Sequence, residues 1–390
     1  MTPADLDFLT SPQGEALLNH LMSQDLSPKN HLALVTSLRK TYPIAHISPA
    51  LTLIQTRQKA VAKFGDMAHH LFFTPDALEQ ASDPMIRAYR AQKFVDRVVV
   101  DNGCGIGADS LAIAGMAQSV IGVDSDPVRI MMARLNVERL GISNIEFVVD
   151  DVTTRPLELS HAFFFDPARR DELGDRLFGV ENYIPPLSTI YRWDGHFGAV
   201  KVSPAVKLDE LSGYDGQVEF ISVSGDLKEA VLWLDGAKSP RATRITDGEM
   251  YHWDAPDFLP DTKPLSPPRA WLIEPDPAII RAGLVQDMAE KWGLFMLDEQ
   301  IAYLTGDQHP HNEWVRAWQI HDWMPFHLKK LRAYLRERHI GRITVKKRGS
   351  PLTPESLIAQ IKPKGDNACT LALTQHLGNP IVIICAEYPN

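Results

Sequence analysis

The stretch that decides the fold is VVVDNGCGIGADS, residues 98–110 of a chain of 390 residues. The valines predict a buried strand, and Gly103, Gly105 and Gly107 allow the backbone to bend tightly and to approach a ligand closely. The helix expected after this loop offers free amide groups at its start. Because Gly103, Gly105 and Ala108 also fit the G-x-G-x-x-G/A fingerprint, the loop alone does not distinguish a dinucleotide from another adenosine-containing cofactor.

Short apolar runs alternate with helical patterns on the C-terminal side of this loop. The runs are SVIGVD (119–124), IEFVVD (145–150) and HAFFFD (161–166). Such alternation indicates an α/β fold with a parallel sheet covered by helices on both faces. Each of these three runs ends in aspartate, as does the strand before the glycine loop, and the carboxyl ends of parallel strands meet at one crevice, where open sheets bind ligands. The alternative is that the four aspartates are unrelated helix caps or turn residues; they are Asp101, Asp124, Asp150 and Asp166.

The positions of these acids favour one cofactor. Asp101 precedes the first glycine by two residues, where its charge would repel a pyrophosphate and attract the cationic end of S-adenosylmethionine. Asp124 lies 21 residues beyond Gly103, a separation at which an acid commonly accepts hydrogen bonds from ribose hydroxyls. Asp150 or its neighbour Asp151 could accept from the adenine amino group, although Asp151 could instead cap a turn. We therefore expect S-adenosylmethionine rather than NAD.

These residues carry a family resemblance. The segments DNGCGIG, GVDSDP and VVDDV resemble, in order and spacing, the cofactor motifs of class I S-adenosylmethionine-dependent methyltransferases. Further segments are similar to those of bacterial methyltransferases that carry a THUMP-like C-terminal domain, and together the similar segments cover most of the chain. They are FFTPDALEQAS (72–82), FFDPARR, VKVSP, SGDLKEAVLWL, EPDPAIIRAGLV (274–285) and VKKRG. The resemblance implies a Rossmann-like methyltransferase sheet.

The segment FFFDPARR, residues 163–170, places the carboxylate of Asp166 at the end of an apolar strand. The resemblance implies that this group faces the sulfonium methyl, where amino-group methyltransferases place Asp or Asn followed by Pro-Pro-aromatic. Asp166 and the Pro167 carbonyl could accept hydrogen bonds from a target amine and direct its lone pair, since transfer needs mainly alignment. The sequence departs from the pattern at Ala168 and Arg169, so the aromatic ring that normally stacks on a flipped base is absent there.

Other residues could complete an acceptor site. Tyr183 or Trp193 in the following loop could supply a stacking platform, and the alternative for each is a place in the core. Arg169 and Arg170 could bind an acceptor phosphate, and the alternative is an ion pair with a neighbouring acid such as Asp171 or Glu172.

The charge distribution bears on the acceptor. The net charge of −9 argues against nonspecific coating of nucleic acid. Nine Lys or Arg residues nevertheless lie between Phe326 and Arg348, against the single acid Glu337. The resemblance of this unit to the RNA-binding THUMP fold implies phosphate recognition, with Lys346, Lys347 and Arg348 on a strand end. RNA is therefore the expected partner, and an ordinary solvated helix and strand are the alternative.

The chain divides into three predicted domains. Residues 1–93 form a helical domain in which TSPQG, LSPKN and ISPA place Ser or Thr before Pro at helix starts. Residues 94–255 form the cofactor-binding Rossmann-like domain. Residues 256–390 contain a Pro-rich linker and a small α+β, THUMP-like domain that closes with a β-α-β-β unit.

Composition excludes several classes of protein. Three cysteines without CxxC spacing argue against a disulfide framework or a zinc knuckle, and no metal site is expected. No apolar run is long enough to span a membrane, and the N-terminus lacks the basic start and apolar segment of an export signal. We expect a cytoplasmic protein.

Together these observations predict an S-adenosylmethionine-dependent methyltransferase that acts on RNA, with a base amino group as acceptor. One alternative is a methyltransferase of a protein or small molecule. Another is a degenerate methyltransferase that serves as an RNA-binding scaffold because its DPARR segment has lost activity. The complete glycine loop and the four aligned acids favour an active enzyme, and a dehydrogenase is the least favoured reading.

Overall fold

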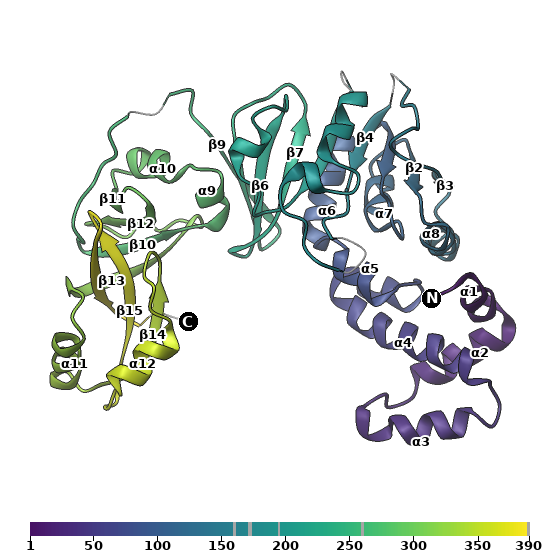
Figure 1. Ribbon diagram of the computed structural model, residues 1–390, viewed down its shortest axis with the longest axis horizontal. Coiled ribbons are helices and arrows are strands. Elements are labelled where there is room, and N and C mark those ends of the chain that lie inside the picture. The colour runs from purple at the N-terminus through teal and green to yellow at the C-terminus, as the bar shows by residue number, and fades with distance from the viewer. Residues whose placement is uncertain (159–160, 171–173, 194–195, 259–260, 388–390) are drawn as a thin grey trace. The chain divides into compact units, whose positions relative to one another are not determined.

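A computed structural model of the chain describes residues 1–158, 161–170, 174–193, 196–258 and 261–387 (Figure 1). The chain folds into two compact units. Unit 1 comprises Met1–Gly216 and Ala230–Ala237, and unit 2 comprises Gln217–Glu229 and Lys238–Asn390. The predicted bounds at residues 93 and 255 do not coincide with this division, and they remain a prediction.

Unit 1 begins with helices, as the sequence predicts. They are α1 (Pro3–Thr10), α2 (Pro12–Met22), α3 (Pro28–Leu38), α4 (Ile44–Phe64), α5 (Pro75–Gln80) and α6 (Pro84–Ala91), with short 3-10 turns at Gly65–His69 and Gln92–Phe94. All but α4 start with proline, which fits the first helical position because its nitrogen needs no partner there. Thr2, Ser11, Thr74 and Asp83 cap four of these starts by accepting a backbone N–H.

The prediction of a helix start at ISPA is wrong. Helix α4 begins at Ile44 and continues through Pro49, although a proline inside a helix removes one backbone hydrogen bond. The residues of α4 on both sides of Pro49, including Ile47 and Leu51, are buried in the core of the helical region. Tertiary packing therefore carries the helix past the proline.

The sheet of unit 1 contains the four strands predicted from the sequence, followed by a fifth. They are β1 (Val98–Asn102), β2 (Ser119–Asp124), β3 (Ile145–Val149), β4 (Ala162–Phe165) and β5 (Gly198–Val202), all parallel, in the order β3-β2-β1-β4-β5. Residues 230–234 of β7 (Asp226–Leu234) pair antiparallel with β5. Helix α7 (Ala108–Ala114) follows β1, and α8 (Pro127–Leu140) follows β2. The Rossmann-like fold is confirmed.

Strand order reverses at one point in this sheet. The chain leaves β1 for β2 and β3 on one side, and returns to β4 and β5 on the other. Open α/β sheets bind ligands outside the carboxyl ends of the strands at such a switch point. Here the carboxyl ends of β1 and β4 carry Asp101 and Asp166. Three 3-10 turns complete unit 1, at Val180–Asn182, Leu187–Trp193 and Leu208–Leu211.

Unit 2 contains two groups of strands. In the first, β6 (Gln217–Val223) is parallel to β8 (Arg241–Thr246), which pairs antiparallel with β9 (Glu249–Asp254). The second is a seven-stranded sheet in the order β11-β12-β10-β13-β16-β15-β14. Its strands are β10 (Trp271–Pro275), β11 (Phe295–Asp298), β12 (Ile301–Gly306), β13 (Val315–Pro325), β14 (Ile340–Lys347), β15 (Asn367–His376) and β16 (Asn379–Cys385).

The helices of unit 2 are α9 (Pro277–Arg281), α10 (Val285–Lys291), α11 (Leu328–Glu337) and α12 (Pro354–Ile361). The predicted closing β-α-β-β unit is confirmed as β14, α12, β15 and β16. Strand β14 is parallel to β15, which pairs antiparallel with β16. Leu331, Leu335, Leu357 and Ile361 bury the apolar faces of α11 and α12 in the core beside this sheet.

Candidate active site

The glycine loop after β1 has the backbone that its sequence demands. Gly103, Gly105 and Gly107 all have positive φ, at 80°, 57° and 82°. A Cβ on Gly103 would lie 2.8 Å from the carbonyl oxygen of Asp166, and one on Gly107 would lie 2.8 Å from the Phe147 ring. Glycine is needed at both positions because these contacts leave no room for a side chain.

Gly105 differs from its two neighbours. Apart from Gly105 itself and its two neighbours in the chain, no atom of the described residues lies within 4 Å of the place where its Cβ would be, and its N–H donates to Oδ2 of Asp124 at 2.9 Å. The loop is therefore held to the end of β2 while the Cα of Gly105 faces open space. This is the geometry expected where a backbone lines a ligand crevice.

Asp101 is fully buried at the end of β1. Its Oδ2 accepts a hydrogen bond from the Ser110 hydroxyl, while its Oδ1 has no partner among the described residues. Burial and the neighbouring charge of Asp109 raise the pKa of Asp101 to about 8. The raised pKa favours the protonated carboxyl when no cation is bound, so the negative charge expected at Asp101 depends on a cationic ligand.

Asn102 adds a second unsatisfied group beside Asp101. Its side chain is 2% exposed, and its Nδ2 has no partner within the described part of the chain. Buried polar groups are normally hydrogen-bonded, so the unpaired acceptor on Asp101 and the unpaired donor on Asn102 suggest that a ligand completes at least one of them. The methionine end of S-adenosylmethionine carries an ammonium and a carboxylate, so it can supply a donor to Asp101 and an acceptor to Asn102. The residues fit this cofactor.

Asp124 ends β2 and is 6% exposed. Its Oδ1 accepts from the Asp126 N–H at 2.9 Å, and Arg129 lies 3.9 Å from Oδ2. Each carboxylate oxygen has a second lone pair, so a ribose hydroxyl can still donate to Asp124.

Asp150 and Asp151 accept hydrogen bonds from different partners. Oδ1 of Asp151 accepts from the backbone N–H and the hydroxyl of Thr153, at 2.8 and 2.7 Å, which is a turn cap. Asp150 accepts from Arg155 at 2.9 Å, and this hydrogen bond lowers the pKa of its carboxyl. The turn-cap alternative holds for Asp151, and Asp150 is the remaining candidate for the adenine amino group.

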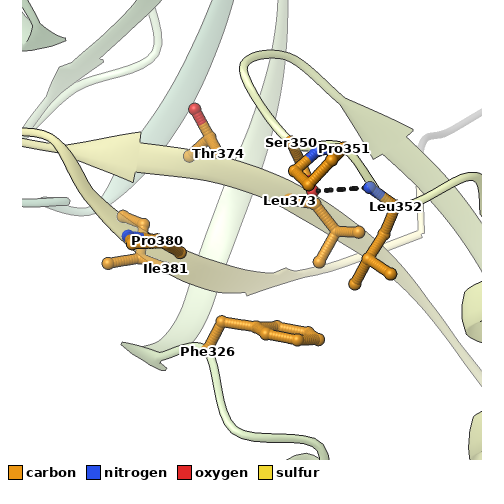
Figure 2. Close-up of a pocket in the computed structure, with 8 residues that line it drawn as sticks. All are labelled: Phe326, Ser350, Pro351, Leu352, Leu373, Thr374, Pro380 and Ile381. Carbon is orange, nitrogen blue, oxygen red and sulfur yellow. Dashed lines mark hydrogen bonds between the residues drawn. The ribbon is translucent and has the colours of Figure 1, made fainter.

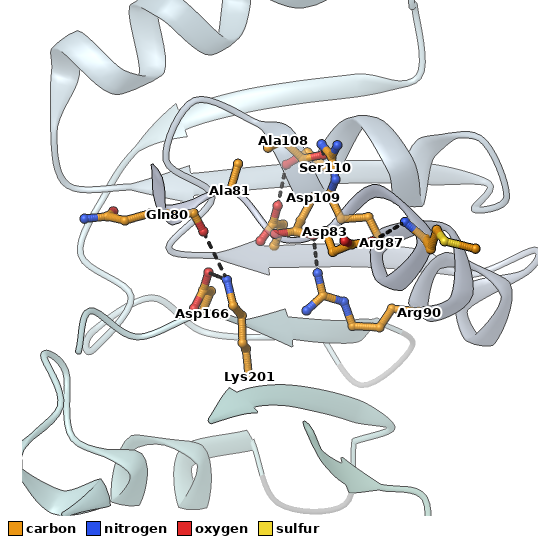
Figure 3. A network of polar contacts seen from close by, with 12 residues as sticks. Gln80, Ala81, Asp83, Arg87, Arg90, Ala108, Asp109, Ser110, Asp166 and Lys201 are labelled. Carbon is orange, nitrogen blue, oxygen red and sulfur yellow. Dashed lines mark hydrogen bonds and ion pairs between the residues drawn. The ribbon is translucent and has the colours of Figure 1, made fainter. Parts of the chain in front are cut away.

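Asp166 follows β4 and is paired with Lys201, a residue that the sequence analysis does not single out. The Lys201 ammonium lies 2.8 Å from Oδ2 of Asp166, and it also donates to the Gln80 carbonyl at 3.4 Å (Figure 3). The Asp166 side chain is 24% exposed, whereas that of Lys201 is 4% exposed. The sequence held a signal for Lys201, because a lysine inside the apolar run GAVKV is unusual for a buried strand.

A segment of the helical region lies beside Asp166 and Lys201. The Lys63 ammonium binds the carbonyls of Leu78, Glu79 and Ala81, at 2.8, 3.1 and 2.5 Å. Burial lowers the pKa of Lys63, and the nearby Lys201 charge lowers it further. These contacts hold the segment 78–83 in place, and Figure 3 shows part of it beside Asp166 and Lys201.

Two predicted stacking platforms are buried instead. Trp193 is 2% exposed and packs against Phe163 and Phe165, with ring centroids 4.8 and 5.4 Å apart. Tyr183 is 4% exposed, and its hydroxyl accepts from the Ser203 N–H at 3.2 Å. The prediction that either ring receives a base is wrong, because the core covers both.

The arginines after Pro167 have a mixed environment. Arg170 is exposed and lies 3.3 Å from the Glu79 carboxylate, so the ion-pair alternative holds for it with an acid of the helical region. Arg169 is half-buried, and its carbonyl accepts from the Leu177 N–H at 2.9 Å. Asp171 and Glu172, the acids named from the sequence, lie outside the described residues.

At the basic strand end of unit 2, Glu274 pairs with two of the three predicted cations. Glu274 lies 2.5 Å from the Lys346 ammonium and 3.5 Å from Arg348, while Lys347 is exposed. For Lys346 and Arg348 the expectation of free phosphate-binding cations must therefore be corrected. Lys347 keeps the surface position that the prediction requires.

A small cavity of about 190 Å³ lies elsewhere in unit 2 (Figure 2). Apolar side chains such as Phe326, Leu352 and Ile381 line most of it, and none of the predicted site residues does. In the described ranges, no group of three or more His, Cys, Asp or Glu side chains is placed to hold a metal ion. None of the helices there has both the length and the apolar character needed to cross a membrane.

Comparison with known proteins agrees with this geometry. The methyltransferase domain family matches residues 99–165, the THUMP domain-like family matches residues 315–387, and a domain family of unknown function matches residues 2–60. A structure of a presumed methyltransferase from Porphyromonas gingivalis W83 superposes with a TM-score of 0.72 at 19% identity, covering 90% of this chain and 92% of that one. At this identity the likeness shows the fold.

Two curated relatives add sequence similarity. An uncharacterized S-adenosylmethionine-dependent methyltransferase of Mycobacterium tuberculosis is 32% identical over 331 residues, which is 82% of this chain and 90% of the relative. The 23S rRNA (uracil(1939)-C(5))-methyltransferase of Aeromonas salmonicida is 32% identical over 133 residues, 31% of this chain and 30% of that enzyme. With the glycine loop and the carboxylates around it, the long match establishes that the chain belongs to the S-adenosylmethionine-dependent methyltransferases with a THUMP-like C-terminal domain.

Proposed function

We propose that this methyltransferase acts on RNA and that its acceptor is an amino group of a base. The observation that carries the proposal is the position of Asp166, whose carbonyl packs against Gly103 of the cofactor loop while its side chain remains partly exposed. An acceptor bound by Asp166 would therefore lie next to the cofactor. The THUMP-like domain and the partial match to an rRNA methyltransferase support RNA as the acceptor molecule.

The proposed chemistry needs only alignment by the protein. S-adenosylmethionine held by the glycine loop and Asp124 would supply a methyl group activated by its sulfonium, and the carbon–sulfur bonding pair would stay with sulfur as the amine lone pair formed the new carbon–nitrogen bond. Oδ1 of Asp166 and the carbonyl of Pro167 accept hydrogen bonds from the amine, which points its lone pair at the methyl carbon. The surplus proton on nitrogen passes to Oδ1 of Asp166 or to water.

A ring for stacking on the base comes from the segment after Pro167. Ala168 pairs with Ile184, and the Leu177 N–H donates to the Arg169 carbonyl, so these two pairs of residues lie side by side. Phe178 follows directly and is 79% exposed. An exposed ring close in sequence to Asp166 is suited to stack on a base, so we propose Phe178 for this role.

Methyl transfer from radiolabelled S-adenosylmethionine tests the proposal. Total RNA and total protein from a strain that lacks this gene are incubated separately with the wild-type protein and with Asp166→Ala. We expect label in RNA, and a loss of at least about 100-fold in the variant, because the acceptor is no longer aligned. Equal cofactor affinity of the two proteins is the control for folding. Label in protein alone would contradict an RNA acceptor.

A further inference from the structure

Asn136 joins the glycine loop to the helical region. It lies on α8 and is 1% exposed. Its Oδ1 accepts from the Phe72 N–H at 2.7 Å, and its Nδ2 donates to the carbonyls of Phe72 and Ile106 at 3.3 and 3.2 Å. Because a side-chain amide has two N–H groups, the two carbonyls use both of its donors. One buried side chain therefore holds together two backbone segments that are distant in sequence.

The orientation of this amide is set by its partners. A backbone N–H can only donate and a backbone carbonyl can only accept, so the amide oxygen must face the Phe72 N–H and the nitrogen must face the carbonyls. Ile106, the anchored residue of the loop, lies between Gly105 and Gly107, which both have positive φ. Because glycine leaves a loop many alternative conformations, an anchor between two glycines restricts the loop strongly.

Packing adds to this connection. The side chains of Ile106 and Ala108 are 4% and 7% exposed, and they belong to the same hydrophobic core as Phe72. Arg57 on α4 holds the residue before Phe72, since its Nε donates to the Leu71 carbonyl at 2.8 Å. The helical region therefore packs directly on the glycine loop and is itself fixed at the place of contact.

Two arginines of α6 make a second connection just after the loop. Nη2 of Arg87 donates to the Lys63 carbonyl at 2.6 Å, and its Nη1 donates to the carbonyl of Ala108, the first residue of α7, at 3.3 Å. Arg90 pairs with Asp109 in the first turn of α7, and both side chains are largely buried (Figure 3). The helix that follows the glycine loop is thus anchored to the helical region as well.

We propose that Asn136 is a positioning residue for S-adenosylmethionine, which holds the glycine loop in its binding conformation by joining Ile106 to Phe72. Asn136 acts through the loop and needs no contact with the cofactor. As a consequence, local opening of the helical region at Phe72 and release of the cofactor are coupled. The inference rests on the assignment of the glycine loop to the cofactor, and it does not depend on RNA as the acceptor.

Hydrogen exchange in the full-length wild-type protein tests this coupling without any substitution. If opening at Phe72 releases the glycine loop, the open form cannot bind S-adenosylmethionine. A concentration of about 100 times Kd should then slow exchange of the Phe72 amide by about tenfold or more. Amides of α3, which is largely exposed, are the control and should exchange at an unchanged rate. An unchanged rate at Phe72 would overturn the proposal.

The cofactor affinity of Asn136→Ala provides the second test. Without the amide, the loop occupies its binding conformation for a smaller fraction of the time, so we expect affinity to fall by about tenfold, measured by calorimetry. Asn144→Ala is the matched control. The Asn144 amide also donates to two backbone carbonyls, those of Ala114 and Ala117 at 2.9 and 3.5 Å, but neither belongs to the glycine loop. This control should lose stability with little change in affinity.

Exchange in the Asn136 variant distinguishes positioning from general destabilisation. In folded Asn136→Ala, the Phe72 amide should exchange faster than in the wild type, and S-adenosylmethionine should slow it less, because the two segments are no longer joined. Asn136→Ser retains a hydroxyl donor and should give a smaller loss of affinity if Asn136→Ala does not fold. Wild-type affinity in a folded Asn136 variant, or an equal loss in Asn144→Ala, would contradict the proposed role.

Gly105→Asp separates this inference from the assignment of the loop. If Gly105→Asp binds the cofactor normally, the glycine loop is not the cofactor site and the proposal fails with that assignment. If Gly105→Asp loses the cofactor while the folded Asn136 variants retain it, only the role of Asn136 is wrong. Neither result bears on RNA as the acceptor, because no acceptor is present in these measurements.

Discussion

Asp101 and Asp166 lie at the carboxyl ends of neighbouring parallel strands, yet their surroundings are opposite. Asp101 is fully buried, has an oxygen without a partner among the described residues, and has a raised pKa of about 8. Asp166 is partly exposed and has a lysine 2.8 Å away. The protein supplies the positive charge for Asp166, whereas for Asp101 a bound cation must bring it. We therefore propose that these two aspartates, which look alike in sequence, have different tasks, Asp101 toward the cofactor and Asp166 toward the acceptor.

The largest effect expected on the cofactor side comes from Gly105→Asp. A side chain there enters the open space of the crevice and adds a negative charge, so we expect cofactor affinity to fall by about 100-fold or more, measured by calorimetry. Gly141→Asp is a matched control. Gly141 also has positive φ and open space around it, but it ends α8 outside the crevice. Both variants should lose about 1–2 kcal/mol of stability from backbone strain, and only Gly105→Asp should lose the cofactor.

The next effect is a pH dependence that only Asp101 should produce. If the ionised form binds the cofactor ammonium, affinity should rise about tenfold from about pH 7 to pH 9, because the carboxyl with a pKa of about 8 must first release its proton. Calorimetry in two buffers should detect that proton release near pH 7. Asp101→Asn should abolish both effects. If the cofactor affinity of the wild type does not change with pH, ionised Asp101 does not bind the cofactor ammonium.

The same carboxyl affects folding in the absence of cofactor. Its pKa in the folded protein lies above its ordinary value of 3.8, so the folded state retains a proton that the unfolded state has lost. Its contribution to stability is complete below about pH 4 and is lost as the pH rises to about 8. Asp101→Asn should remove that part of the slope in denaturant unfolding.

On the acceptor side, Phe178→Ala should raise the acceptor KM by about tenfold without changing cofactor affinity, since stacking of a base on a ring contributes about 1–3 kcal/mol. Steady-state kinetics with the labelled acceptor measures this. Tyr191 is a suitable control because it is 58% exposed but its ring already stacks on Tyr214. An equal change in Tyr191→Ala would show that Phe178 has no specific role.

The smallest effect extends the comparison to unit 2. Lys346 is paired with Glu274 and Lys347 is exposed, although they are neighbours in sequence. Lys347→Ala should weaken RNA binding by about threefold and reduce the salt dependence by roughly one phosphate contact. Lys346→Ala should mainly lower stability, because it leaves Glu274 with fewer partners. Binding titrations at several salt concentrations distinguish the two.

Much of the fold could be predicted from local patterns. The glycine loop and the strands ending in aspartate predict the parallel sheet, because strand alternation and glycine conformation are set by nearby residues. Proline after Ser or Thr predicts most helix starts in the N-terminal region. The failure at Pro49 has a tertiary cause, since the buried residues on both sides of it in α4 hold the helix together.

The site could be predicted only in outline. Tyr183 and Trp193 have the right residue type in the right loop, but their burial depends on packing against β4 and β5, which no local pattern reveals. The partners of Lys346 and Asp166 are 72 and 35 residues away in sequence, and only the folded chain brings them together. The protonation of Asp101 follows from its complete burial, which a residue list does not contain.

The contact between Gly103 and the Asp166 carbonyl has a consequence for substitutions at either residue. The proposed cofactor loop and the proposed acceptor residue are in direct backbone contact, because a Cβ on Gly103 would lie 2.8 Å from the Asp166 carbonyl oxygen. A shift of either segment would disturb the other. A substitution that moves the backbone at either Gly103 or Asp166 is therefore expected to change cofactor affinity and methyl transfer together.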